Sequence, residues 1–319
     1  APDWSETFAE LRHKPSFWWM AIAASLVAFV GYGLISFQAP FLQREHGLSV
    51  RDAALQFGAP LSLLAAMGTF LGGYITERLT ARSPTAVAWV PALGIAIAVP
   101  AYAAAFFSED LTAVFVLWGI GAVFHYSYLG AQYNIGQGVV SNRSRATAIA
   151  VLLISVSLIG NGIGPYFVGF MSDFFMQREL LSLDPGTLLS PEACKAADMV
   201  RSVTDDALCQ NANSEGLKFA MAVTASIFLI ASACFLMCAR TLQQDFVAEL
   251  GKAKGLDDTN TGPTGKQGDI TGAFHGQSLR GTAPSLRRTI STKHLLNLAK
   301  TAAKKNRGCP LSFLFLSLI

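Results

Sequence analysis

The sequence predicts an all-α integral membrane protein with six transmembrane helices. Hydrophobic residues make up 52% of the chain and charged residues only 14%, whereas about a quarter of the residues in soluble domains are charged. Six apolar runs contain no Lys, Arg, Asp or Glu, and each is long enough to cross a bilayer core, which needs about 20 residues. These runs are 17–37, 53–75, 86–107, 111–140, 146–171 and 219–239.

The two sides of this six-helix bundle differ in their content of Lys and Arg. By the positive-inside rule, the side richer in these residues faces the cytoplasm. Residues 1–15 and the segment after the sixth span are therefore both expected there. The cytoplasmic side holds Arg12, Lys14, Arg78, Arg82, Arg143, Arg145 and Arg240, and the outer side holds Arg44 and Arg51.

The first three spans have features of helices that pack against protein. In the first span, Tyr32 lies between Gly31 and Gly33. The second span presents a nearly continuous face of glycine, alanine, serine and threonine, which most often serves helix packing. The third span contains Pro91 and Pro100, and each proline frees a backbone carbonyl that a neighbouring helix must compensate.

A tight hairpin is expected between the second and third spans. Gly72 and Gly73 would let two helix backbones approach closely. Glu77, Arg78 and Arg82 would then lie at the cytoplasmic helix ends, where the acid can bond the terminal groups of the partner helix. The alternative is an ordinary helix hairpin with charges at the membrane interface, in which these residues have no special role.

The fourth span carries polar side chains that lipid would exclude. His125 lies about midway along it, and Tyr128 and Gln132 share its face. Together with Tyr32 on the first span and Asn161 on the fifth, we expect these residues to line an interior cavity. Because an ionisable group at membrane depth is a candidate functional group, His125 could couple proton movement to transport. A neutral histidine that bonds a neighbouring helix is the alternative.

The fifth span combines close packing with a weak point in its backbone. Gly160 and Gly164 are one turn apart, which allows a close helix contact. Pro165 follows directly and interrupts the backbone hydrogen bonds at the same place. Such a helix suits a part of the protein that moves.

Two segments outside the spans have distinct compositions. Residues 177–215 are expected to form a long acidic outer loop, in which Cys194 and Cys209 could join in an oxidising compartment. The sequence alone leaves that disulfide open. Residues 241–319 lack periodicity and are rich in Gly, Thr and Lys, so we expect a basic, disordered cytoplasmic tail. An artefactual reading frame after the last span is the alternative.

These stretches resemble the major facilitator superfamily. The hairpin is similar to the family's short loop signature, with Glu77 where that signature usually has aspartate, and with Thr80 and Ala81 in place of its glycine-arginine step. Within the superfamily, the chain most resembles the spinster-like branch, and it looks like spans seven to twelve of a twelve-helix fold. The supporting stretches are 31–33, 40–48, 72–82, 145–148 and 160–165, with Gly169, Ser172 and Asp173.

The resemblance implies a secondary active transporter that moves a small organic or lipid-like solute by alternating access, coupled to an ion or to protons. Because interfacial charge pairs can hold one arrangement of helix ends and release another, we expect Gly73, Glu77, Arg78 and Arg82 to act in conformational switching. The resemblance also implies that residues 1–15 link this bundle to a missing N-terminal six-helix half. The protein would lie among the lipids of the cell or inner membrane, with no cofactor. A non-transporting receptor or scaffold of the same fold is the alternative.

Other chemistry has no recognisable pattern in the sequence. We find no phosphate-binding glycine loop, no paired intramembrane acids, no metal-ligand spacing rich in histidine and no nucleophile elbow. We therefore expect neither an enzyme, nor a metal site, nor a nucleic-acid partner.

Overall fold

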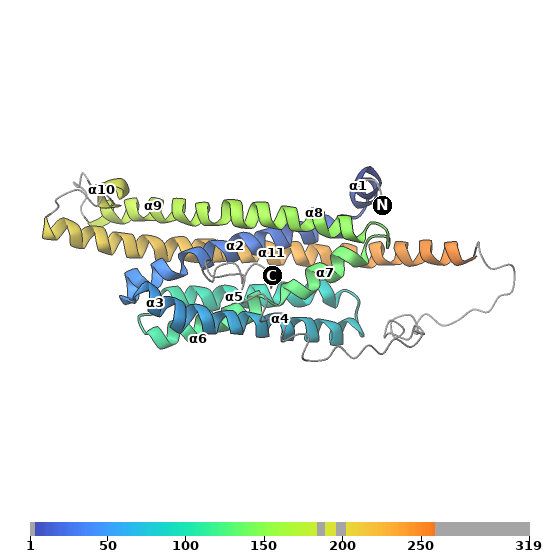
Figure 1. The fold of residues 1–319 in the computed structure, drawn as a ribbon, viewed down its shortest axis with the longest axis horizontal. Coiled ribbons are helices and arrows are strands. Elements are labelled where there is room, and N and C mark those ends of the chain that lie inside the picture. Colours follow the sequence, from blue (N-terminus) through green and yellow to red (C-terminus); the bar gives the residue numbers. More distant parts are fainter. Residues whose placement is uncertain (1–3, 184–188, 196–201, 259–319) are drawn as a thin grey trace, which may run out of the picture. The chain divides into compact units, whose positions relative to one another are not determined.

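The computed structural model describes residues 4–183, 189–195 and 202–258, with side chains described between Ser5 and Phe246. Every element in these ranges is a helix (Figure 1). Six stretches are long and apolar enough to cross a membrane, which confirms the predicted all-α membrane fold. They are Pro15–His46, Val50–Thr80, Ala86–Phe106, Leu111–Gly138, Arg145–Leu183 and Val203–Phe246.

Three of these spans consist of consecutive helical pieces. The first span is the single helix α2 (Pro15–His46), the third is α5 (Ala86–Phe106), and the sixth belongs to α11 (Val203–Asp258). The second is built from α3 (Val50–Asp52), the π-helical η1 (Ala53–Gly58) and α4 (Ala59–Thr80). The others are α6 (Leu111–His125) with α7 (Tyr128–Gly138), and α8 (Arg145–Ser157) with the π-helical η2 (Leu158–Ile163) and α9 (Gly164–Leu183). Outside the spans lie α1 (Trp4–Arg12) and α10 (Pro191–Lys195).

The helices begin and end where the local sequence satisfies their terminal groups. Proline opens α2 at Pro15, a position at which its missing N–H costs nothing. That helix stops at Gly47, whose φ of 64° is the left-handed conformation that glycine adopts easily. The carboxylate of Asp110 accepts hydrogen bonds from the backbone N–H of Thr112 and Ala113, at 3.3 and 3.0 Å, and so caps α6.

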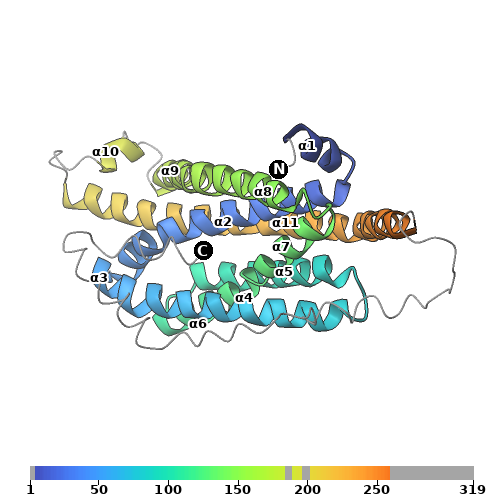
Figure 2. The ribbon, with the colours of Figure 1, turned by 45° about the vertical axis from the view of Figure 1, so that its right-hand side comes forward.

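Helices α2 and α11 form the centre of the described bundle. They run side by side in both views (Figures 1 and 2), and α11 also packs against α5 and α9. Phe17 and Met20 of α2 are fully buried, as are Phe228 and Phe235 of α11. The two helices are therefore the surface on which the other spans assemble.

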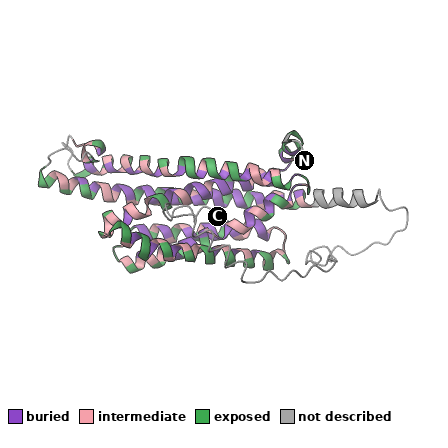
Figure 3. Ribbon diagram, viewed as in Figure 1, coloured by how far each residue is buried: buried purple, intermediate pink, exposed green. Residues whose placement is uncertain are grey.

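The second and fifth spans are the least covered. Only 17% and 22% of the residues in their most apolar windows are buried, against 61% in the first span. Exposed residues recur along both spans (Figure 3), and they include large apolar side chains such as Phe70 on α4 and Tyr166 on α9. These faces have to be covered by lipid or by other protein.

The fifth span is tightly packed and irregular at the same place. A π-helical segment, η2, ends directly before Gly164 and Pro165. A Cβ atom added to Gly160 would lie 2.9 Å from the Cβ atom of Ala28, and one added to Gly164 would overlap the carbonyl oxygen of Phe29. The predicted close contact at these two glycines is therefore present, and the partner is α2.

Most of the predicted outer loop 177–215 is helical, which corrects the sequence expectation. Helix α9 continues to Leu183, α10 follows, and α11 begins at Val203. Beyond the apolar runs these helices still pack on each other, because Met176, Leu180 and Ala212 form a small buried cluster. The spans were predicted from runs without charged residues, and such runs do not include amphipathic extensions of a helix.

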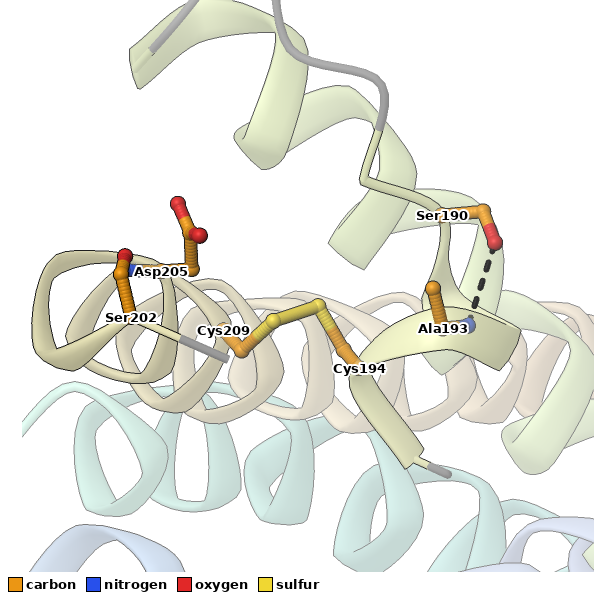
Figure 4. The surroundings of a disulfide bond; sticks show 6 residues. All are labelled: Ser190, Ala193, Cys194, Ser202, Asp205 and Cys209. Atoms are coloured by element: carbon orange, nitrogen blue, oxygen red, sulfur yellow. Dashed lines mark hydrogen bonds between the residues drawn. A yellow bond between two sulfur atoms is a disulfide. The ribbon is translucent and has the colours of Figure 1, made fainter. Parts of the chain in front are cut away.

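A disulfide bond closes this end of the bundle. Cys194 of α10 is joined to Cys209 of α11 (Figure 4). The start of α10 is fixed by Ser190, whose hydroxyl oxygen accepts a hydrogen bond from the backbone N–H of Ala193 at 3.2 Å. The pairing that the sequence left open is thus present in the structure.

The expected disordered tail is wrong for residues 241–258, because α11 continues to Asp258. Leu242 and Asp245 are buried, and the Asp245 carboxylate accepts a hydrogen bond from the backbone N–H of Ser16 at 3.0 Å. The helix continues beyond the end of the apolar run because it still packs against α2. The rest of the predicted tail, residues 259–319, lies outside the described residues.

Candidate functional site

A cavity of about 50 Å³ opens between α2, the second span, α5 and α6. Its walls combine apolar and aromatic side chains with a few uncharged polar groups. Among the residues that the structure describes, none of those lining the cavity is charged. The polar and aromatic members are Gln38, Ser62, Tyr102, Trp118, His125 and Tyr126.

His125 lies in the wall of this cavity at the end of α6. Its side chain is only 3% exposed, and its Nδ1 atom lies 3.2 Å from the hydroxyl oxygen of Tyr102. The rings of Tyr126 and Phe228 lie 4.6 and 4.7 Å away between centroids, and the Tyr128 ring is stacked at 6.1 Å. All of these contacts are with uncharged residues, and they hold the imidazole in one place.

The other residues of the predicted cavity face lie in different surroundings. Tyr128 is buried beside His125. Gln132 is buried too, and its Oε1 atom has no hydrogen-bond partner among the described residues. Tyr32 is half-buried and packs close to Gly160, whereas Asn161 is exposed. Of the five predicted residues, His125 alone is among the described residues that line the cavity.

Tyr102 and Gln38 are among the cavity residues that were not in the predicted set. Tyr102 comes from α5 and Gln38 from α2. Each is a polar residue within a mostly apolar run, and this is the signal that could have marked them. The sequence does not show which helix each one faces, so their place beside His125 in the cavity wall follows only from the packing.

The predicted switch residues lie at the surface. Glu77, Arg78 and Arg82 are exposed. Within the described part of the chain, none of the three forms an ion pair. The guanidinium of Arg78 instead lies over the ring of Tyr74, 5.2 Å from its centroid, in a cation–π arrangement. These cations are free to find other partners.

Gly73 lies at a helix contact, because a Cβ atom added to Gly130 of α7 would be 3.5 Å from the Cα atom of Gly73, although a Cβ atom added to Gly73 itself would meet nothing within 4 Å. The closest contacts lie at Gly72, where an added Cβ would be 2.5 Å from the Cα atom of Ser127, and at Gly68, where it would be 2.7 Å from the Cα atom of Val123. Helix α4 therefore touches α6 through Gly68, and it touches the turn between α6 and α7 through Gly72.

Charged groups tie α2 to α11 at both ends of the bundle. At the Glu45 end, the Glu45 carboxylate accepts hydrogen bonds from the Lys218 ammonium at 3.0 Å and from the Ser214 hydroxyl. At the Asp245 end, besides the bond from Ser16, the ammonium of Lys14 donates to the backbone carbonyl oxygen of Asp245 at 3.2 Å. Both clusters are partly or wholly withdrawn from solvent.

The fold defines a six-helix integral membrane bundle, and a comparison with known families agrees. The family model described as the Major Facilitator Superfamily matches residues 1–165, and the chain belongs to this family. Its relatives place it in the spinster-like branch, as the sequence predicted.

Among curated relatives, an MFS-type efflux pump of Mycolicibacterium smegmatis is 28% identical over 163 residues, covering 51% of this chain and 38% of the pump. Protein spinster homolog 3 of Danio rerio is 27% identical over 184 residues, covering 53% and 37%. Protein spinster of Drosophila melanogaster is 24% identical over 251 residues, covering 68% and 41%.

Two crystal structures of a bacterial homolog to the human lysosomal transporter spinster are also similar. The inward-facing, unoccupied structure is 48% identical with a TM-score of 0.67, covering 75% of this chain and 50% of that one. The inward-facing, occupied structure is 48% identical with a TM-score of 0.66, covering 74% and 51%. The chain thus spans about half of each of these structures, and less of the three curated relatives.

Proposed function

We propose that this chain is half of a secondary transporter, which moves a small organic or lipid-like solute across a membrane by alternating access. The observation that carries this proposal is the uncharged cavity beside His125, inside a bundle of the major facilitator family. Binding sites for small molecules usually measure about 300–1,000 Å³. Because the cavity measures about 50 Å³, a solute needs further walls, which we assign to the N-terminal six-helix half.

The little-covered second and fifth spans support this assignment. Their exposed apolar side chains, such as Met67 and Phe70 on α4 and Leu158 on η2, offer two helical faces to the other half. We place residues 1–15 as the cytoplasmic link to it, and the Asp245 end of the bundle in the cytoplasm. Rocking of the two halves would then open the cavity to each side in turn.

Transport by the full-length protein that contains this chain is the direct test. Purified protein in proteoliposomes should take up a radiolabelled solute with saturation kinetics. Candidate solutes are neutral amphiphiles with one hydroxyl group. A non-transporting receptor or scaffold is the second candidate, and it predicts solute binding without uptake for every solute that binds.

We further propose that Gly73, Glu77, Arg78 and Arg82 act in conformational switching. The exposure of Glu77, Arg78 and Arg82 around the end of α4 leaves their charges able to pair with helix ends of the other half in one state only. Arg78→Ala should lower the maximal uptake rate about tenfold and leave the Michaelis constant nearly unchanged. Uptake against solute concentration measures both, and a raised Michaelis constant at full rate would assign Arg78 to solute binding instead.

Coupling to an ion or to protons is part of the proposal, but we assign the proton to a group other than His125. A protonated ring would have no counter-ion among its described contacts, which are uncharged, and an unpaired buried charge is costly. His125→Gln should therefore keep the wild-type dependence of uptake on pH, measured at matched membrane abundance. A flattened pH profile would place the coupling proton on His125 after all.

A further inference from the structure

We propose that the cavity beside His125 is a subsite for a neutral hydroxyl group carried by an otherwise apolar solute. This inference rests on the proposed transport function and names the chemistry that its site selects. Two hydrogen-bonding groups in the cavity wall lack protein partners, and the wall around them is apolar. No comparison assigns a role to either group.

The first group is the side-chain amide of Gln38. Its Nε2 atom is buried and has no hydrogen-bond partner among the described residues, although Gln38 lines the cavity. A buried donor without a partner costs about 1–3 kcal/mol. Rotation of the amide toward an oxygen atom in the cavity would remove that cost, so the amide favours a ligand that can accept a hydrogen bond.

The second group is the Nε2 atom of His125. The Nδ1 atom is engaged by the Tyr102 hydroxyl, while Nε2 forms no hydrogen bond with the part of the chain that the structure describes. Whichever ring nitrogen carries the proton, a hydroxyl group can serve Nε2, since a hydroxyl both donates and accepts. A carbonyl or ether oxygen could serve only one of the two tautomers.

The position of the His125 ring in the cavity wall depends on Gly31. A Cβ atom added to Gly31 would lie 2.9 Å from Cε1 and 3.2 Å from Nε2 of His125. The imidazole therefore packs directly on the Gly31 backbone, in the wall of the cavity that both residues line. A methyl group at this position would displace the ring, and with it the Nε2 atom that the hydroxyl needs.

The walls exclude a charged ligand. Leu34, Leu61 and Trp118 line the same cavity, and none of the lining residues in the described ranges could pair with an ion. A charge moved into such surroundings loses its hydration without compensation. A neutral hydroxyl fits, with the apolar body of the solute extending out of the small cavity.

The test compares two ligands of similar shape, 1-hexanol and 1-chlorohexane, by saturation-transfer NMR on the full-length protein in detergent. Wild type should bind 1-hexanol about tenfold more tightly, the equivalent of one or two hydrogen bonds at about 1.4 kcal/mol. Gly31→Ala should abolish this preference by displacing the imidazole from its place in the cavity wall. Gly169→Ala is the matched control, because the added Cβ would lie 3.5 Å from Phe37, an ordinary contact.

A second variant keeps the test decisive if Gly31→Ala does not fold. Gln38→Leu preserves the volume approximately and removes the donor, so it should also reduce the preference for 1-hexanol. Equal binding of the two ligands to wild type, or a preference that both variants retain, would overturn the subsite. Binding is measured without transport, so a protein that prefers 1-hexanol but moves no solute would overturn the proposed function and leave the subsite standing.

Discussion

Replacing Gly164 by alanine should prevent normal assembly of the bundle. The added Cβ would overlap the carbonyl oxygen of Phe29 and lie 3.3 Å from the backbone nitrogen of Gly33. Both obstacles are backbone atoms of the central helix α2, so no side chain can turn away to make room. Overpacking costs about 1–3 kcal/mol even where side chains can adjust, and we expect a loss at the upper end of this range or beyond it.

The neighbouring glycine provides the control for this prediction. A Cβ atom added to Gly162 would meet nothing within 4 Å, so Gly162→Ala changes the same segment without a new contact. Fluorescence-detected size-exclusion chromatography and melting temperature in detergent measure assembly. If both variants elute and melt like wild type, α2 and α9 are not in the close contact described here.

Replacing Lys218 by methionine should lower the free energy of unfolding by about 2 kcal/mol, through a weaker contact at the Glu45 end of the bundle. This is less than the full cost of breaking a buried ion pair, because some solvent reaches the pair. Only 12% of the Lys218 side chain and 18% of the Glu45 side chain are exposed. Lys218 also pairs with Glu215. Its loss leaves two carboxylates near each other without their shared cation, so the melting temperature should fall.

Lys195→Met is the matched control for Lys218. Lys195 also forms an ion pair, with Asp173, but the two side chains are 46% and 42% exposed. Exposed pairs contribute at most about 1 kcal/mol, so this variant should melt close to wild type. Equal destabilisation by the two variants would show that burial does not set the strength of these pairs.

The positions of the six spans followed from the sequence, because lipid tolerates few charges and the apolar runs are therefore nearly uninterrupted. The helix ends did not follow. Helix α9 continues past the predicted end of its span through Met176 and Leu180, and α11 begins sixteen residues before Phe219. These extensions are held by buried contacts such as Met176 with Ala212, and packing between helices cannot be seen in a single run of residues.

The candidate site was predictable in part. His125 stood out as an ionisable residue in an apolar span, and it does lie in the cavity wall. Its partner Tyr102 comes from another helix, and the sequence does not specify that pairing. Asn161 lies in the π-helical segment η2, where the extra residue in the turn shifts the helical phase. The predicted cavity face assumed a regular spacing of about 3.6 residues per turn, so it does not give the direction of Asn161 correctly.

The ties between α2 and α11 have a mechanical consequence. Glu45 and Ser16 lie at opposite ends of α2, and their partners Lys218 and Asp245 lie far apart along α11. Two helices that are bonded to each other at both ends cannot slide or twist past each other, so they should move together as one rigid body. Any change of shape inside this bundle would then fall on the helices with irregular turns, at η1 and η2, which are the places to look for its hinges.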